Sequence, residues 1–182
     1  MTYRILMCIS LLFCLAFANP DEVVEETAAI EWMTFHEMLE RSKIKPQKVI
    51  IDVYTDWCGW CKRMETSTYQ NKRIANYINQ HFYPVKFDAE SKELIELYGQ
   101  QYKYTVPSQG RGYHELALIF TRGQLTYPTT VFLNTDLTSI QTFPGYHNIV
   151  DMDKVLHFIN DNHYKRTSFE DFSASFVSKV HY

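Results

Sequence analysis

The chain has 182 residues, which suits one ordinary domain with a short appendage and argues against a two-domain enzyme. Apolar residues make up 46% and aromatic residues 15%, with only 6 Gly and 6 Pro, so a packed core is expected and a disordered chain is not. The formal net charge is -3, and no cluster of Lys and Arg is present, so nucleic acid is excluded as a partner class.

The first 18 residues have the pattern of a secretory signal peptide. An apolar run over residues 5–17 follows Arg4 and ends in the small-x-small triplet Ala16-Phe17-Ala18. We predict cleavage after Ala18, because polar residues begin before the run reaches the roughly 20 apolar residues of a membrane anchor. Retention as an anchor and lipid attachment at Cys14 are the alternatives. Cleavage predicts a periplasmic or secreted protein with no stable membrane span, in a compartment where disulfides persist.

The mature chain is expected to begin with a flexible leader. Residues 19–31 are acidic without an apolar period, and they precede a predicted domain at residues 32–182. Apolar residues then recur at helical spacing behind Thr34, a suitable N-cap, which predicts a helix that ends before Pro46. Residues 49–54 are β-branched and apolar on both faces apart from one Asp, which predicts a central strand covered on both sides.

Four further elements are expected before residue 100. The apolar spacing predicts two helices and a strand, at residues 58–69, 74–82 and 82–88. Pro84 cannot donate a ladder hydrogen bond, so that strand should start there or lie at an edge of the sheet. Leu94, Leu97 and Tyr98 then predict a helix that stops at Gly99.

A long connection follows, over about residues 100–126, and connections of this length are usually functional elaborations. Within it, Leu116, Ile119 and Phe120 predict a short packed helix closed by Gly123. The remaining elements are predicted as a hairpin at residues 129–134 and 139–143, a helix behind Asp151, and a helical tail at residues 164–182 that begins with a capping box at Ser168.

A Cys-x-x-Cys sequence lies at the junction between the predicted central strand and the helix after it. Cleavage of the signal peptide would remove Cys8 and Cys14 and leave only Cys58 and Cys61. The first sulfur is expected at the helix N-terminus, where unpaired N–H groups stabilise a thiolate, so Cys58 is predicted to be the nucleophile. Cys61, one turn further in and less exposed, would resolve a mixed disulfide, and Gly59 would permit close approach of the partner.

Three other interpretations of the Cys pair are weaker. A structural zinc site needs four ligands, and no His stands at the required spacing, so no metal site is predicted. A haem attachment site needs His after the second Cys, where Lys62 stands. A purely structural disulfide across two residues would constrain little of the unfolded chain.

The segment at residues 52–62 resembles the active-site segment of thioredoxin-like proteins, including a buried acid six residues before the first Cys. Tyr127-Pro128-Thr129 resembles the cis-proline loop of the same family. The likeness runs from about Trp32 to His163 and is to exported bacterial thioredoxin-family proteins and to the C-terminal domain of the transmembrane thiol:disulfide interchange protein. It implies an α/β thioredoxin fold, a central mixed sheet flanked by helices, with an insertion before the cis-proline loop.

The resemblance also implies roles for single residues. Asp52, an acid in an apolar strand, should have a raised pKa and move protons to and from Cys61, although it could instead be a satisfied polar group of the core. Lys86, on the neighbouring strand, could pair with Asp52 or could be a surface lysine. The residues expected to contact substrate are Trp57, Gly59, Trp60, Tyr127, Pro128 and Gly145, with core packing the alternative for Trp57 and a simple turn for Gly145.

Together these observations predict a monomeric thiol:disulfide oxidoreductase that uses no cofactor beyond its Cys pair. We expect it to reduce disulfides in exported proteins with electrons from an unidentified donor. An oxidase or isomerase of the same fold is one alternative. The other is a non-catalytic module that binds protein partners.

Overall fold

Residues 29–180 are described in a computed structural model of the chain, so the predicted signal peptide and most of the leader lie outside the described residues. Helices and strands alternate in the first half, and the order of elements is α1 (Phe35–Ile44), β1 (Val49–Tyr54), α2 (Gly59–Met64), the π-helical turn η1 (Glu65–Tyr69), α3 (Lys72–His81), β2 (Tyr83–Asp88), β3 (Ile95–Leu97), β4 (Gln100–Tyr102), β5 (Tyr104–Thr105), β6 (Tyr113–His114), α4 (Glu115–Phe120), β7 (Thr129–Leu133), β8 (Ser139–Pro144), α5 (Ile149–Asn160), the 3-10 turn η2 (His163–Lys165) and α6 (Phe169–Ser175).

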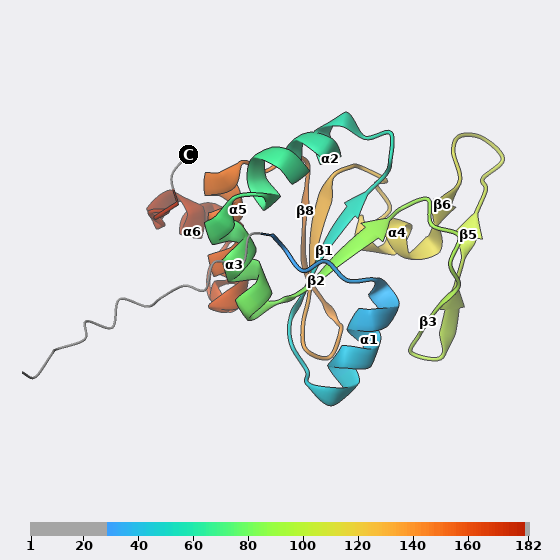
Figure 1. The fold of residues 1–182 in the computed structure, drawn as a ribbon, viewed down its shortest axis with the longest axis horizontal. Coiled ribbons are helices and arrows are strands. Elements are labelled where there is room, and N and C mark those ends of the chain that lie inside the picture. Colours follow the sequence, from blue (N-terminus) through green and yellow to red (C-terminus); the bar gives the residue numbers. More distant parts are fainter. Residues whose placement is uncertain (1–28, 181–182) are drawn as a thin grey trace, which may run out of the picture.

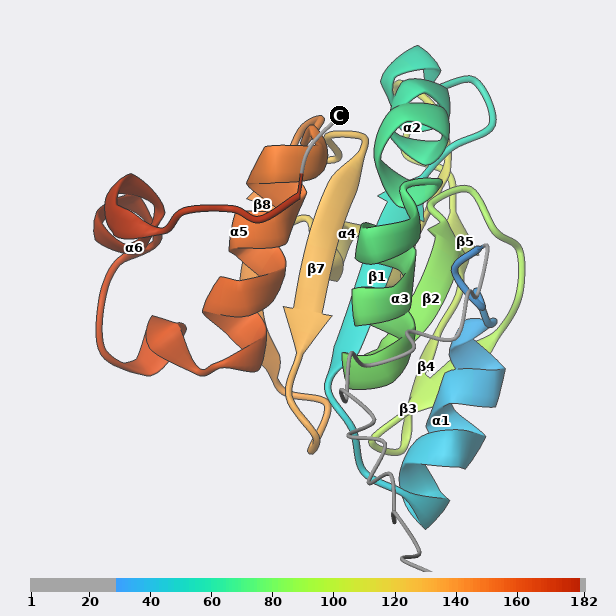
Figure 2. The ribbon, with the colours of Figure 1, turned by 60° about the vertical axis from the view of Figure 1, so that its left-hand side comes forward.

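The centre of the fold is a four-stranded mixed sheet with the order β2-β1-β7-β8. β1 runs parallel to β2 and antiparallel to β7, and β7 pairs antiparallel with β8. β1 therefore lies inside the sheet, as its two apolar faces predict, and β2 with its Pro84 lies at an edge. In Figure 2, α3 and α5 lie in front of the strands.

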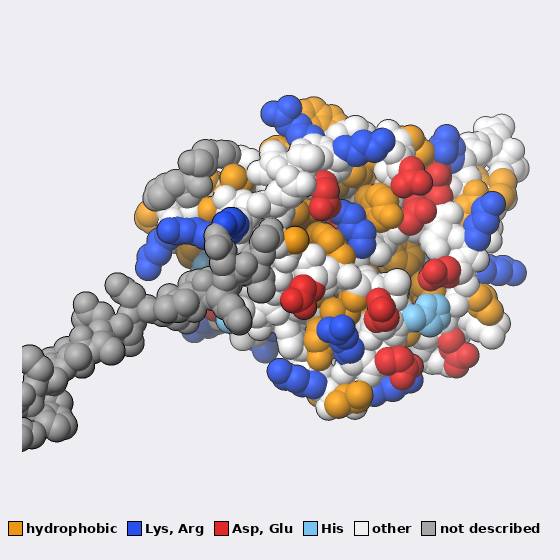
Figure 3. All heavy atoms as spheres, viewed as in Figure 1, with side chains coloured by type: hydrophobic (Ala, Val, Ile, Leu, Met, Phe, Trp, Pro, Cys, Tyr) orange, Lys and Arg blue, Asp and Glu red, His pale blue; other side chains and the backbone are white. Residues whose placement is uncertain are grey.

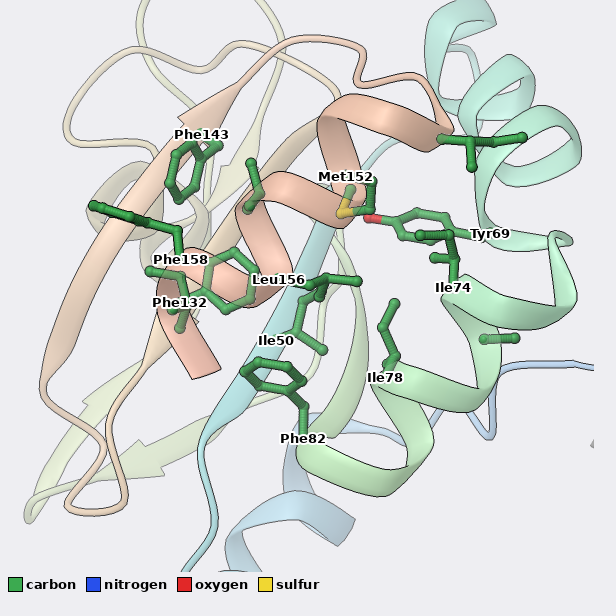
Figure 4. Packing of buried hydrophobic residues seen from close by; sticks show 14 of the residues in the cluster. Ile50, Tyr69, Ile74, Ile78, Phe82, Phe132, Phe143, Met152, Leu156 and Phe158 are labelled. Carbon is green, nitrogen blue, oxygen red and sulfur yellow. The ribbon is translucent and has the colours of Figure 1, made fainter. Parts of the chain in front are cut away.

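Alternate residues of the inner strands belong to two separate hydrophobic cores, one on each face of the sheet, because successive side chains of a strand point to opposite faces. On one face, Ile50 and Phe132 pack under α3 and α5. Figure 4 shows Ile50 beside Leu156 of α5 and Ile78 of α3, and the Phe132 ring contacts the Phe82 and Phe143 rings edge-on. On the other face, β1 and β7 pack against α1 and α4 through Val49, Ile51, Val53, Val131, Leu133, Phe35, Met38, Leu116 and Phe120. This arrangement confirms the predicted α/β thioredoxin fold.

Helix capping follows the sequence at two of three predicted places. Thr34 caps α1 with a capping box, in which its hydroxyl accepts from the Glu37 N–H and Glu37 accepts from the Thr34 N–H. Ser168 caps α6 by accepting from the Asp171 N–H, but Asp171 Oδ2 accepts from the Ser168 hydroxyl and not from its backbone N–H, so only half of the predicted capping box is formed. The helix predicted behind Asp151 in fact begins at Ile149, and Asn148 is its cap. The earlier start follows from the packing of buried Ile149 against the core.

The helix predicted at residues 94–98 is wrong. Ile95–Leu97 pairs antiparallel with Gln100–Tyr102 as the hairpin β3–β4. Its two-residue turn, Tyr98-Gly99, has positive φ angles of 54° and 75°, the backbone conformation of a tight hairpin turn. Three apolar residues within five positions, Leu94, Leu97 and Tyr98, are too few to distinguish a short helix from a short strand.

The predicted insertion holds more structure than its short helix. Besides α4 it contains β4 and the pair β5–β6, and its first hairpin begins five residues before the predicted boundary at residue 100, with Ile95. In α4 Leu116 and Phe120 are buried, but Ile119, predicted to pack, is exposed. In Figure 1, β3, β5 and β6 stand at the right, on the side of the molecule away from α5 and α6.

The last residues of the predicted leader contact the domain. Ile30 is buried in the core beneath α3, and the Glu31 N–H donates to Asn79 Oδ1 at 2.9 Å. Contacts with the domain therefore begin before the predicted boundary at residue 32. Among residues 29–180, no helix combines the length and apolar character that crossing a bilayer requires.

Candidate active site

The two cysteines lie where β1 gives way to α2 and are joined as a disulfide with an S–S distance of 2.08 Å. The Cys58 N–H donates to the Thr55 carbonyl at 3.1 Å, which closes the turn out of the strand. Cys58 is the N-cap of α2, and its Sγ accepts from the Cys61 N–H at 3.1 Å. A sulfur in this position is surrounded by unpaired helix N–H groups, which favour its thiolate once the disulfide is reduced.

The exposure of the two sulfurs does not separate their roles as we predicted. Cys58 is 5% exposed and Cys61 is 6% exposed, so Cys61 is not the more shielded of the two in the disulfide form. What distinguishes Cys58 is its place at the helix N-terminus.

Asp52 lies directly beneath this site and is 1% exposed. The parallel register of β1 and β2 places it opposite Lys86, and Lys86 Nζ lies 2.7 Å from Asp52 Oδ2. No other hydrogen bond reaches either carboxylate oxygen from the described residues. Burial therefore raises the pKa of Asp52, and the nearby Lys86 charge opposes this shift only in part.

Lys86 is held by more than Asp52. Its ammonium also pairs with Glu65, on the π-helical turn after α2. The rings of Trp32, Tyr54 and Tyr69 surround it, with centroids 4.8, 5.2 and 5.5 Å from Nζ. Burial alone would lower the pKa of Lys86, but the carboxylates of Asp52 and Glu65 outweigh burial and raise it. Lys86 is thus a charged partner of Asp52, enclosed by two carboxylates and three aromatic rings, and not a surface lysine.

A hollow of about 370 Å³ connects these groups to the disulfide. Cys61, Glu65 and Lys86 all line it, together with Trp32, Tyr54, Thr55, Asp56, Lys62 and Thr66. Cys61 and the Glu65–Lys86 ion pair therefore border one space. Asp52 itself does not line this hollow, and it meets the hollow only through its ion pair with Lys86.

The predicted proline loop lies against the active-site loop. The Tyr127–Pro128 peptide bond is cis, and the Tyr127 ring meets the Trp57 ring edge-on, with centroids 5.9 Å apart. The Gly145 N–H donates to the Pro128 carbonyl at 2.8 Å. Gly145 has a φ of 91°, a conformation that favours glycine, so it ties the end of β8 to the proline loop.

Both predicted tryptophans are exposed beside the disulfide. Trp57 is 52% exposed and Trp60 is 60% exposed, so core packing does not explain Trp57. Trp60 lies 5.6 Å from the Tyr146 ring, and the Arg63 guanidinium lies over both rings at 5.8 and 5.9 Å. Figure 3 shows hydrophobic and basic side chains together over α2, at the top of the view. A Cβ at Gly59 would meet no atom within 4 Å, so the fold itself does not require glycine there.

Several groups at the site were missed from the sequence. Glu65 follows Cys61 by four residues on one helical run, a spacing that places both on one face and could have indicated it. Trp32, Glu90 and Arg111 lie far from the Cys pair in sequence, and no pattern connects them to it. Among residues 29–180, no three His, Cys, Asp or Glu side chains are grouped as metal ligands.

These features define a thioredoxin-fold protein with a Cys-x-x-Cys pair at a helix N-terminus, a buried acid beneath it and a cis-proline loop beside it. The Thioredox_DsbH family model, described as a protein of unknown function, DUF255, matches residues 23–178. The chain therefore belongs to this thioredoxin-like family, as the sequence resemblance predicted.

Individual relatives match over part of their length. The chain is 28% identical over 107 residues to the disulfide bond reductase DsbH of Chlamydia pneumoniae, covering 53% of this chain and 60% of that protein. It is 26% identical over 113 residues to an uncharacterized protein of Caenorhabditis elegans, covering 61% of this chain and 13% of that protein. The chain thus spans less than two thirds of either relative.

Solved structures share the fold. A thioredoxin from Thermus thermophilus aligns with a TM-score of 0.54 at 16% identity, covering 72% of this chain and 87% of that one. A thioredoxin-fold protein from Helicobacter pylori aligns with a TM-score of 0.52 at 20% identity, covering 71% of this chain and 78% of that one. At these identities the likeness establishes the fold alone.

Proposed function

We propose that this protein is an exported thiol:disulfide oxidoreductase that reduces disulfides in other exported proteins. The observation that carries the proposal is the Cys58–Cys61 disulfide at the start of α2, with Asp52 and Lys86 beneath it and Pro128 beside it. Dithiol exchange needs a stabilised thiolate, a second thiol within reach and a base for the second thiol. The site supports each of these, and the reaction needs no cofactor beyond the Cys pair.

The reaction starts from the reduced Cys pair. The Cys58 thiolate attacks one sulfur of the partner disulfide, forms a mixed disulfide and releases the other partner sulfur as a thiolate. The Cys61 thiol then gives its proton to the Asp52 carboxylate, and its thiolate attacks Cys58 Sγ. This step closes the Cys58–Cys61 bond and releases the second partner sulfur, which takes up a proton. Two electrons pass to the partner, and a dithiol donor must return them.

The reducing direction is supported by the residue between the cysteines and by one relative. Trp60 offers no imidazole to stabilise the Cys58 thiolate, so the reduced form lacks the extra stabilisation that makes a strong oxidant. The name of the Chlamydia pneumoniae relative identifies that protein as a disulfide bond reductase. We therefore expect a reduction potential nearer to about -270 mV, typical of thioredoxin, than to about -120 mV.

The compartment follows from the predicted signal peptide, which lies outside the described residues. Cleavage after Ala18 would deliver a periplasmic or secreted protein in which only Cys58 and Cys61 remain. N-terminal sequencing of the exported protein tests this step. A mature chain that still begins at Met1 would support a membrane-anchored form.

Two Cys variants test the catalytic roles. Cys61→Ser should accumulate mixed disulfides with partner proteins on non-reducing gels, because the resolving thiol is absent, whereas Cys58→Ser should accumulate few. Accumulation by Cys58→Ser alone would reverse the roles. A double variant that still captures the same partners without a covalent bond would favour a binding module instead of an enzyme.

The redox direction is tested by equilibration with glutathione. A potential near about -270 mV agrees with a reductase. A potential above about -180 mV would favour an oxidase or isomerase of the same fold.

A further inference from the structure

The exposed indole of Trp57 is held by residues from separate parts of the chain. Its Nε1–H donates to Glu90 Oε1 at 3.1 Å. Arg111 binds the same carboxylate with two hydrogen bonds, from Nε to Oε1 at 2.6 Å and from Nη2 to Oε2 at 3.1 Å. Its guanidinium carbon also lies 5.1 Å from the Trp57 ring centroid. Glu90 thus binds the indole N–H, and Arg111 lies over one face of the ring. Tyr127 contacts the same ring edge-on.

Glu90 and Arg111, which contact the Trp57 indole, lie outside the predicted active-site segment. Glu90 follows the end of β2, and Arg111 lies on the loop between β5 and β6, inside the insertion. Glu90 is partly buried, and its backbone N–H donates to Asp88 Oδ1 at 2.9 Å, which holds its backbone against the end of β2. The hydrogen bonds from Arg111 lower the pKa of Glu90, so the pair is fully charged at neutral pH.

The fixed position of the Trp57 indole affects how a partner binds. An indole that moves freely must be ordered when a partner docks, and this ordering costs side-chain entropy. An indole already fixed avoids that cost, and its N–H is already satisfied, so it offers a partner only apolar surface. A protein segment wide enough to reach from the disulfide to Trp57 gains from this. A small disulfide that contacts only the sulfurs gains much less.

We propose that Arg111, through Glu90, is a positioning residue that fixes Trp57 as a wall of the site for protein disulfides. The insertion thereby sets a preference for protein substrates over small disulfides. This inference rests on the proposed oxidoreductase function. The preference for protein disulfides is thereby assigned to the Glu90–Arg111 ion pair and not to the remaining residues of the insertion.

The kinetic test compares insulin, a protein disulfide, with hydroxyethyl disulfide, a small one, under turnover with dithiothreitol. Arg111→Met should raise the KM for insulin about five-fold, equivalent to about 1 kcal/mol, while kcat changes much less. The loss with hydroxyethyl disulfide should be clearly smaller. Arg122→Met is the matched control, since Arg122 is an exposed arginine of the same insertion that follows the end of α4.

Further variants show whether the ion pair acts as one unit. Glu90→Gln should raise the KM to a similar extent, and Arg111→Lys, which keeps the charge but cannot form both hydrogen bonds, should fall between wild type and Arg111→Met. The Glu90→Gln/Arg111→Met double variant should lose little more than either single variant. Additive losses would overturn the proposal.

A spectroscopic test reads the indole directly. The chain has 3 Trp, so Trp32→Phe/Trp60→Phe leaves Trp57 as the only tryptophan. In that background Arg111→Met should lower the fluorescence anisotropy of Trp57 and increase its quenching by acrylamide, and Arg122→Met should do neither. Unchanged anisotropy in Arg111→Met would overturn the proposal whatever the kinetics show.

The outcomes separate this inference from the proposed function. Wild-type protein that reduces insulin, with no change of KM in Arg111→Met, leaves the function standing and refutes the positioning role. Equal losses on both substrates that follow a fall in thermal stability would also refute it, in favour of a structural ion pair. Wild-type protein that reduces neither substrate refutes the proposed function, and the substrate role of Arg111 with it.

Discussion

Replacing Asp52 with Asn tests the conclusion that the buried acid beneath the disulfide destabilises the folded protein when it is ionised. Asp52 is 1% exposed, and its carboxylate has one charged partner, Lys86 Nζ at 2.7 Å. Burial raises the pKa of Asp52 despite that partner. Asn has nearly the same size and shape and carries no charge at any pH. The variant should therefore be more stable than wild type wherever Asp52 is ionised.

The sign and size of the effect follow from proton linkage. An unfolded Asp loses its proton near pH 3.9, and the folded-state pKa of Asp52 lies higher. Between these two values the folded state binds more protons than the unfolded state, so this acid's contribution to stability is present below the lower value and is lost as the pH rises. The loss can reach about 1.4 kcal/mol per pH unit, and it stops once the folded acid is ionised. The raised pKa of Lys86 adds no pH dependence in this range, because Lys86 stays charged throughout.

Urea unfolding of the oxidised wild type and Asp52→Asn at intervals from pH 4 to pH 9 gives the comparison. The difference in unfolding free energy should be smallest near pH 4, grow in favour of the variant and then level off. The rise of this difference from its low-pH value to the plateau, divided by about 1.4 kcal/mol, gives the pKa shift of Asp52. A flat difference, or a variant that loses stability as the pH rises, would refute the reasoning. The same variant should slow release of mixed disulfides near neutral pH, because Cys61 loses its base.

Two stability predictions follow from the core and from the first helix cap. Phe132→Ala removes a fully buried ring that packs against Phe82 and Phe143, and it should cost about 3–5 kcal/mol in urea unfolding. Val177→Ala, at an exposed position, should change the unfolding free energy by less than about 0.5 kcal/mol. Thr34→Ala removes the hydroxyl that accepts from the Glu37 N–H and should cost about 1 kcal/mol, and Thr34→Ser should restore most of it. A Phe132→Ala loss below about 1 kcal/mol would mean that the core collapses around the gap, and equal losses for the two Thr34 variants would mean that methyl packing and not the cap is responsible.

Much of the frame could be predicted from local patterns. The run at residues 49–54 is apolar on both faces, which is the requirement for a strand with a core on each side, and it became β1. Thr34 followed by Glu37 predicts a capped helix from backbone chemistry alone. The Cys pair at the strand–helix junction predicts a disulfide at a helix N-terminus, and this was confirmed.

Short elements escaped prediction because their partners carry no apolar pattern. Ile95 and Leu97 formed β3 by pairing with Gln100–Tyr102, a polar segment that sequence periodicity cannot identify as a strand. The turn between them depends on positive φ at Tyr98, where a tyrosine gives no local signal of a hairpin. Only the closed hairpin determines the conformation of this segment.

The sequence alone determined which residues could perform redox chemistry, since the identity and spacing of Cys58 and Cys61 are local properties of the chain. The tertiary structure decided what surrounds them. Strand register placed Lys86 opposite Asp52, and the fold brought Glu90 and Arg111 to Trp57 from loops that lie 33 or more residues away. Charge and aromatic contacts of this kind act through space over a few ångströms. They carry no period along the chain, so they exist only once the sheet, the insertion and the active-site loop are packed together.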